Sequence, residues 1–403
     1  MRRLWADFGP VYAANGLTGF VFAATGPVAI ILAVGTGGGL SAAELASWMF
    51  GVFFINGLLT VAMSWRFRQP LCFFWTIPGT VLVGPALQHL SFPAVVGAFW
   101  VTGALVLLLG LSGLVRRAMA AVPMPVVMGM VAGVFLRFGL DLVRALRDDA
   151  PVAAPMVLAF LLLSALPGLS RRVPPLIGAL LVGGAACALL GRVDASALGG
   201  MALAHPVLQV PAWSPTAMVE LVVPLAITVL VVQNGQGVAV LRAAGHQPPF
   251  DACTIMCGAG SLLCAAVGAV SSCMTGPTTA LITSSGDRQR QYTAAISTGV
   301  LAILFGLFSP GFTGLLLAAP PSFIAVLGGL AMLRVLQAAF TASFRDRFAL
   351  GALVAFLVTV ADVGVLNIGA AFWGLVAGFT VSWLLERGDF TPPGCAARPP
   401  PTP

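Results

Sequence analysis

Apolar runs of about twenty residues recur from one end of the chain to the other, separated by short segments rich in Arg, Asp, Pro and Gly. An α-helix needs a run of about that length to cross the hydrocarbon core of a bilayer. The pattern predicts fourteen membrane-spanning segments, each end placed to within about four residues. They cover 11–33, 43–64, 70–88, 92–114, 122–140, 152–169, 174–191, 216–241, 252–269, 271–286, 292–309, 320–341, 348–362 and 367–386.

The composition agrees with a membrane protein. Of the 403 residues, 59% are hydrophobic and only 8% are charged, whereas a soluble chain carries about a quarter charged residues. The mean hydropathy is +1.01. We therefore predict an all-α polytopic membrane protein. The sequence has no HExxH, GxSxG or Walker motif, so an enzyme is not expected.

Cysteines and net charge add little to this assignment. Cys253 and Cys257 are followed by Cys264 and Cys273, but no paired CxxC or nearby His accompanies them. We expect no metal site, disulfide framework or cofactor, and interpret these cysteines as packing residues. The net charge of +7 would suit nucleic acid or anionic lipid as a partner. Arginine in cytoplasmic loops explains it without nucleic acid.

Arginine positions predict the orientation, because cytoplasmic loops carry the excess of positive charge. With the N-terminus inside, the cytoplasmic side holds Arg2, Arg3, Arg66, Arg68, Arg116, Arg117, Arg171, Arg172, Arg242, Arg288, Arg290, Arg334, Arg345, Arg347, Arg387 and Arg398. The opposite side holds Arg137, Arg144, Arg147 and Arg192. We therefore predict a bacterial-type inner-membrane protein with both termini in the cytoplasm.

Fourteen spans divide into two halves of seven. Because an odd number of spans reverses the direction of the chain, the halves have opposite orientations, as in the inverted repeats of secondary transporters. We assign a first repeat, a connecting loop, a second repeat and a disordered Pro-rich tail to 1–191, 192–215, 216–388 and 389–403. The third span carries TIPGT (76–80) and the tenth carries TGPTT (275–279), at equivalent positions of the two halves.

Each of these stretches places proline inside an apolar span, where it removes a backbone donor and clashes with the preceding turn. Proline is tolerated in the first turn of a helix, and Thr76 or Thr275 is placed to cap such a helix. We predict two half-helices, starting near Pro78 and Pro277, whose N-termini face each other near the bilayer midplane. Unsatisfied N–H groups and helix dipoles at two such ends favour an anion. Two ordinary proline kinks are the alternative explanation.

Other polar and aromatic residues are expected near the same site. Three amides within 233–236 interrupt an apolar run, where unpaired amides are costly; hydrogen bonding between helices is the alternative role. Phe74 and Trp75 are placed to stack on a planar substrate, although core packing also explains such rings. The predicted substrate-binding residues are Thr76, Pro78, Gly79, Thr80, Cys273, Thr275, Gly276, Thr278, Thr279, Gln233, Asn234, Gln236, Asn15, Phe74 and Trp75.

Proton coupling lacks an obvious carrier in the sequence. Proton-coupled carriers often use a carboxylate or His within the membrane, yet the acidic residues fall at span ends, in loops or in tails, and the histidines look peripheral. Glu44 and Glu220, at predicted span ends, are the acidic candidates. Solvated helix-end acids are the alternative role for both, and the protonation state of the substrate is another route for protons.

Three stretches resemble the benzoate–proton symporter (BenE) family: WRFRQPLCFFWTIPGTVLV (65–83), GMVAGVFLRFGL (129–140) and NGQGVAVLRAAGHQPP (234–249). The resemblance implies the seven-plus-seven fold shared with nucleobase and sulfate transporters. In that fold, spans 1–4 and 8–11 form a core domain that moves against a gate domain of spans 5–7 and 12–14. The resemblance also implies uptake of benzoate with protons. Because the fold often dimerises, a homodimer is one expected assembly.

The leading hypothesis is therefore a secondary active transporter of a small organic anion, with benzoate or a related aromatic carboxylate carried together with protons. The expected partners are that anion, protons and the lipid bilayer. A nucleobase or sulfate carrier of the same fold is one alternative, and an anion channel is another.

Overall fold

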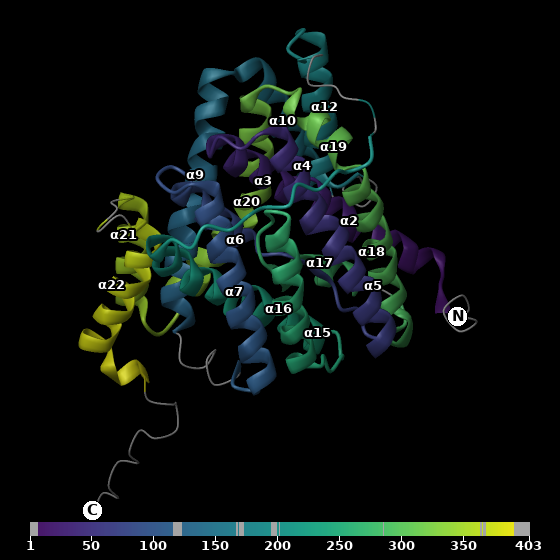
Figure 1. The fold of residues 1–403 in the computed structure, drawn as a ribbon. Helices are drawn as coiled ribbons and strands as arrows, with labels where there is room; N and C mark the ends of the chain where they lie inside the picture. Colours follow the sequence, from purple (N-terminus) through teal and green to yellow (C-terminus); the bar gives the residue numbers. More distant parts are fainter. Residues whose placement is uncertain are drawn as a thin grey trace, which may run out of the picture.

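The computed structural model describes residues 7–115, 123–166, 168, 173–194, 200, 202–284, 286–362, 365 and 368–390. This part of the chain is mainly helical and holds two three-residue strands (Figure 1). Its first half contains α2 (Pro10–Ala24), α3 (Gly26–Gly37), α4 (Ala42–Phe50), η1 (Gly51–Ile55), α5 (Asn56–Phe67), β1 (Phe73–Trp75), α6 (Ile77–Ala86), α7 (Phe92–Ser112), α9 (Met124–Asp148), α10 (Ala150–Ala165) and α12 (Pro175–Leu189).

The second half begins with one long irregular helical stretch made of α13 (Pro215–Ala217), η3 (Met218–Val222), α14 (Val223–Ile227), η4 (Thr228–Asn234) and α15 (Gly235–Ala243). It continues with α16 (Phe250–Ala266), β2 (Ser272–Met274), α17 (Gly276–Ile282), η5 (Arg288–Arg290), α18 (Tyr292–Leu307), α19 (Ser309–Leu317), α20 (Pro321–Phe344), α21 (Ala349–Ala361), α22 (Ala370–Leu385) and η6 (Arg387–Phe390).

The predicted all-α membrane fold is confirmed, and each of the fourteen predicted ranges overlaps a helix. Within the described residues, six helical stretches are long and apolar enough to cross a membrane, or seven if the bent α18–α19 pair is one span. Shorter apolar helices have 10 to 17 residues, so the number of crossings stays a prediction. Some arginines used to predict the orientation lie outside the described residues: Arg2, Arg3, Arg116, Arg117, Arg171, Arg172 and Arg398. Residues 391–403 of the predicted tail also lie outside them.

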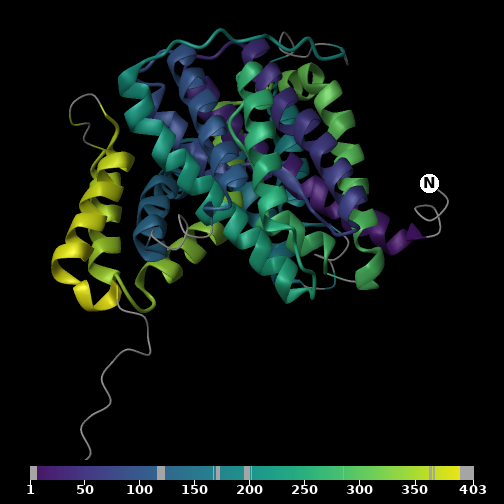
Figure 2. The same cartoon turned by 60° about the horizontal axis from the view of Figure 1, so that its bottom comes forward.

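The helices form two packed groups (Figure 1). Helices α9, α10, α12, α20, α21 and α22 contact one another, and α21 and α22 lie at one edge of the molecule (Figure 2). The other group packs α16 on α7 and α18 on both α2 and α5. An added Cβ at Gly258 would overlap the backbone of Leu107, so α16 and α7 approach closely. The two groups match the spans expected for gate and core, and α3–α20 and α6–α9 contacts join them.

Several long helices depart from regular α-helical geometry. The first span breaks at Thr25 (φ −105°, ψ −94°), and α3 starts with Gly26 and Pro27. The sequence analysis did not anticipate this break. The segments η1, η3 and η4 are π-helical, a geometry that is rare and frequently marks functional sites. Two of these segments lie in the helical stretch that carries the predicted amides.

The start of α21 is capped from the end of α22. Oε1 of Glu386 accepts a hydrogen bond from the Leu350 N–H (2.8 Å), and Oε2 accepts from the Gly351 N–H (3.0 Å) and the Ser382 hydroxyl (2.8 Å). The first N–H groups of a helix have no partner within the helix. The Glu386 carboxylate satisfies two of them and so fastens α21 to α22.

Candidate functional site

Strands β1 and β2 join the third predicted span to the tenth. They pair antiparallel, with Phe73 opposite Met274, Phe74 opposite Cys273 and Trp75 opposite Ser272. Backbone hydrogen bonds extend the pairing at both ends: the Thr76 N–H donates to Ser271 O (3.1 Å), and the Thr275 N–H donates to Cys72 O (3.1 Å). Strand β1 leads into α6 and β2 into α17. The two helices therefore start at opposite ends of one short ladder.

Thr76 is the N-cap of α6, as the sequence predicts. Its hydroxyl accepts from the Gly79 N–H (3.1 Å) and donates to the hydroxyl of Thr228 (3.0 Å). Pro78 stands in the first turn, where its missing N–H costs nothing. The hydroxyl of Thr80 donates back to Thr76 O (3.0 Å). An added Cβ at Gly79 would lie 2.9 Å from the Leu225 side chain, so α6 approaches the eighth span closely at this glycine.

Thr275 is the N-cap of α17, but no side chain caps this helix. The Thr279 hydroxyl donates to Thr275 O, which leaves that hydroxyl turned back onto its own helix. Gly276 lies against α15, because an added Cβ would come within 2.7 Å of the Cβ of Gln236. Thr278, in the first turn, is buried. Among the described residues, the Thr275 side chain thus caps no first-turn N–H group of α17, whereas the Thr76 side chain caps one in α6.

A small cavity lies where these two helix starts meet the break in the first span. It is lined by Phe22, Ala23, Pro27, Phe74, Trp75, Ile77, Thr275 and Thr278. Its volume is about 10 Å³, room for roughly one water molecule. Trp75 is 2% exposed, and its Nε1–H has no hydrogen-bond partner among the described residues. The cavity is therefore small in this conformation, and the residue that carries the unpaired N–H lines it beside two helix N-termini.

The predicted amides fall in different surroundings. Oδ1 of Asn234 accepts from the Met274 N–H (2.7 Å), so this amide supports β2 from behind. Gln233 is buried and Gln236 is exposed. Asn15 is half-buried on α2 and is not among the residues that line the cavity. Cys273 is buried within β2. Of these predicted residues, none lines the cavity itself.

The two acidic candidates also differ. Glu44 is half-buried and is the partner of Ser41 in a capping box at the start of α4. Glu220, expected at a span end, is instead 5% exposed within η3, and its Oε2 lies 2.9 Å from Nε2 of His89. His89 follows α6 and is partly exposed. A buried carboxylate paired with histidine replaces the solvated acid and peripheral histidine that the sequence suggested.

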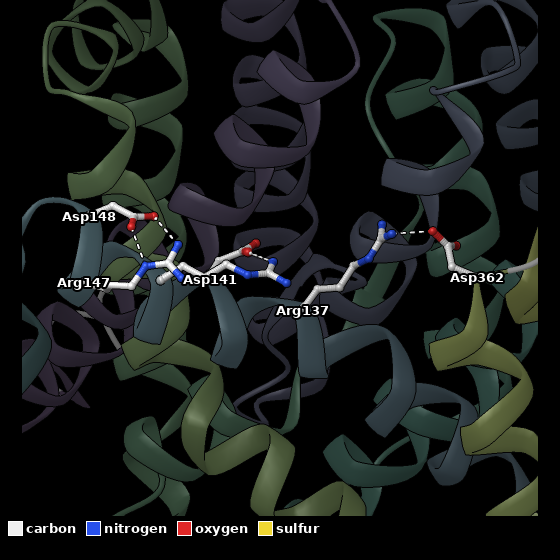
Figure 3. A network of polar contacts seen from close by, with 6 residues as sticks. Arg137, Asp141, Arg147, Asp148 and Asp362 are labelled. Carbon is white, nitrogen blue, oxygen red and sulfur yellow. Dashed lines mark hydrogen bonds and ion pairs between the residues drawn. The ribbon is translucent and has the colours of Figure 1, made fainter.

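A second cavity, of about 280 Å³, lies beside Glu220 between the two groups of helices. Its wall includes Arg137, which pairs with Asp362 at the end of α21 (Figure 3). Further along α9, Arg147 donates to Asp148 (2.6 Å) at the surface. This hydrogen bond lowers the pKa of the Asp148 carboxyl below its usual value. The ion pairs in Figure 3 are largely exposed, unlike Glu220.

Sequence reasoning missed four residues of this region: Phe22, Pro27, Thr228 and His89. Gly26-Pro27 within an apolar run was an available signal for the break in the first span. The contacts of Thr228 and His89 join residues more than a hundred positions apart in the chain. Local patterns carry no information about such pairs.

Comparisons with known proteins agree with the fold. The sequence profile of the BenE family, described as "Benzoate membrane transport protein", matches residues 6–384. The chain is 30% identical over 351 residues to the inner membrane protein YdcO of Escherichia coli (strain K12), covering 84% of this chain and 87% of YdcO. It is 25% identical over 394 residues to the benzoate membrane transport protein of Acinetobacter baylyi (strain ATCC 33305 / BD413 / ADP1), covering 96% and 98%.

Among solved structures, the transmembrane domain of the cyanobacterial bicarbonate transporter BicA is similar, with a TM-score of 0.59 at 15% identity. The match covers 92% of this chain and 97% of that domain. At this level of identity the likeness concerns the fold.

Proposed function

The chain belongs to the BenE family of membrane transport proteins, and from this premise we propose that it carries a small organic anion, benzoate or a related aromatic carboxylate, together with a proton. The observation that carries the proposal is the small cavity at the starts of α6 and α17. Helix N-termini favour negative charge, and the unpaired Trp75 Nε1–H adds a directed donor. Phe22 and Phe74 supply apolar walls for an aromatic ring.

In this proposal the carboxylate lies near Thr275 and Thr278, where no side chain competes for the first-turn N–H groups of α17. Thr76, Pro78, Gly79 and Thr80 shape the facing end of α6. Asn234 supports β2 from behind, and we keep Gln233, Gln236, Cys273 and Asn15 as proposed substrate-binding residues around the opened site. The cavity is too small for benzoate in this conformation, so the substrate enters when the site opens.

Opening follows from relative movement of the two helix groups. We assign the core role to spans 1–4 and 8–11 and the gate role to spans 5–7 and 12–14, in two inverted repeats (1–191 and 216–388). Few elements join the groups, chiefly α3 with α20 and α6 with α9, which suits alternating access by a moving core. The protein would work in the inner membrane with both termini in the cytoplasm.

Uptake into proteoliposomes tests this function. Labelled benzoate should accumulate under an inward proton gradient, saturate, and be competed by substituted benzoates. Protein-free liposomes control for passive entry of benzoic acid. Accumulation that ignores the gradient would exclude symport, and ohmic anion currents across a planar bilayer would identify a channel instead. Competition by nucleobase or sulfate, with no effect of benzoate, would reassign the substrate.

A further inference from the structure

The His89–Glu220 pair joins a buried acid to a partly exposed histidine. Glu220 is 5% exposed, whereas the side chain of His89 is 29% exposed. The distance between Nε2 of His89 and Oε2 of Glu220 is 2.9 Å, which is a hydrogen bond. Among the described residues, no other hydrogen bond or ion pair is recorded for the Glu220 carboxylate. His89 therefore links the Glu220 carboxylate to water, beside the 280 Å³ cavity that Glu220 also lines.

This pair also holds the outer end of α6 to the eighth span. At the start of α6, Thr76 is hydrogen-bonded to Thr228 (3.0 Å); just past its end, His89 is bonded to Glu220. Helix α6 has 10 residues and is about 15 Å long, and the two bonds lie just beyond its two ends. The element that forms one end of the substrate cavity thus carries the pair at its other end. Core movement would displace both together.

The gate elements pack directly on this pair. An added Cβ at Gly369, the N-cap of α22, would overlap Oε1 of Glu220. The adjoining 280 Å³ cavity also receives Arg137 and Arg144 from α9 and Asp362 from the end of α21.

Both arginines of that cavity are already paired with acids. Arg137 binds Asp362 (Figure 3), and Arg144 binds Asp141 (2.8 Å). The described helix α7, which packs on η3, carries no charged residue. His89 is therefore the only partner recorded for Glu220 among these groups.

We propose that the His89–Glu220 pair carries the co-transported proton, an inference that rests on the proposed symport. With a proton on Nε2 of His89 and Glu220 ionised, a proton from water binds Nδ1. The Nε2 proton then passes to Oε2, which leaves a neutral imidazole and a neutral carboxylic acid. The net charge of the pair thereby rises by one unit, from −1 to 0. Release reverses these steps once the pair has reached the other side.

The charge balance gives this step its role. Binding of benzoate adds one negative charge to the core. The core already carries the negative charge of the ionised Glu220 carboxylate in the His89–Glu220 pair. Moving uncompensated charge through a low-dielectric interface is costly. A proton on the pair returns the loaded core to the charge of the empty one, so substrate and proton cross together.

Glu220→Gln tests the proposal because the amide keeps the hydrogen bond to His89 but cannot carry a proton. In proteoliposomes, Glu220→Gln should keep benzoate exchange at equal pH within about twofold of the wild type. It should lose gradient-driven accumulation by about tenfold or more. Asp148→Asn, at an exposed surface pair, is the matched control and should accumulate as the wild type does. Wild-type accumulation in Glu220→Gln would overturn the proposal.

A substrate-free measurement separates this proposal from the proposed function. Infrared pH-difference spectra of the protein in lipid should show a carboxylic acid C=O band that grows on acidification. The component of this band that comes from Glu220 should be missing in Glu220→Gln and kept in Asp148→Asn; a Glu220→Gln spectrum identical to that of the wild type refutes the proton site. If the wild type exchanges no benzoate, the substrate assignment fails while the spectra still decide the proton site.

If Glu220→Gln does not insert, Glu220→Asp decides the matter. It keeps a titratable group, so gradient-driven accumulation should survive with a displaced pH profile. An unchanged profile would contradict a proton on this residue.

Discussion

Trp75→Phe gives the sharpest test of the small cavity at the starts of α6 and α17 as an anion site. The substitution keeps an aromatic ring but removes the Nε1–H, which has no partner among the described residues. If that group donates to the substrate carboxylate, its loss removes a hydrogen bond to a charged group, worth about 2 kcal/mol. An energy of that size weakens benzoate binding about thirtyfold.

The structure supplies a matched control in Trp48→Phe. Trp48 is likewise buried with an unpaired Nε1–H, but it packs against Phe92 and Phe99 and does not line the cavity. Both variants therefore lose the same ring area and the same kind of buried donor. Effects on stability should be similar, whereas only Trp75→Phe should weaken binding.

Benzoate affinity can be measured by isothermal titration calorimetry on protein in nanodiscs, with thermal denaturation followed in parallel. A dissociation constant for Trp75→Phe within about twofold of the wild type would refute a role for this donor. Equal weakening in both variants would mean that lost ring packing, rather than the cavity-lining N–H, decides affinity.

Three further substitutions test other parts of the structure. Gly79→Leu forces a side chain into the space held by Leu225, so uptake should be lost while inserted protein remains detectable by size-exclusion chromatography. Asn234→Leu leaves the Met274 N–H buried without an acceptor and should lower the free energy of unfolding by about 2 kcal/mol, measured by denaturant titration. Glu386→Ala uncaps α21 and should cost a similar amount of about 2 kcal/mol. Unchanged unfolding in either of the last two would contradict these hydrogen-bond assignments.

The breaks in the third and tenth spans could be predicted because their signal is local. Pro78 and Pro277 interrupt apolar runs, and a threonine stands two residues before each. The β1–β2 register could not be predicted in this way. It depends on backbone groups of Phe73 and Met274 that meet only after the whole fold has formed.

The amides and the buried acid show a second limit. Gln233 and Gln236 are three residues apart, which places them on one face of a regular α-helix. However, η4 is π-helical up to Asn234, so the angular spacing changes, and Gln233 is buried while Gln236 is exposed. Hydropathy places Glu220 at a span end, but contacts from His89 and the Gly369 turn enclose it.

The pairing of β1 with β2 has a consequence for how the protein is made. Strand β1 leaves the ribosome about 200 residues before its partner, since Phe73 pairs with Met274. At about 5–20 residues per second, synthesis of the intervening chain takes roughly 10–40 s. During that time the backbone of β1 lacks its hydrogen bonds to β2, and lipid does not tolerate unpaired backbone groups. We therefore expect the third span to stay in the insertion machinery, or in another polar environment, until the tenth span has been synthesised.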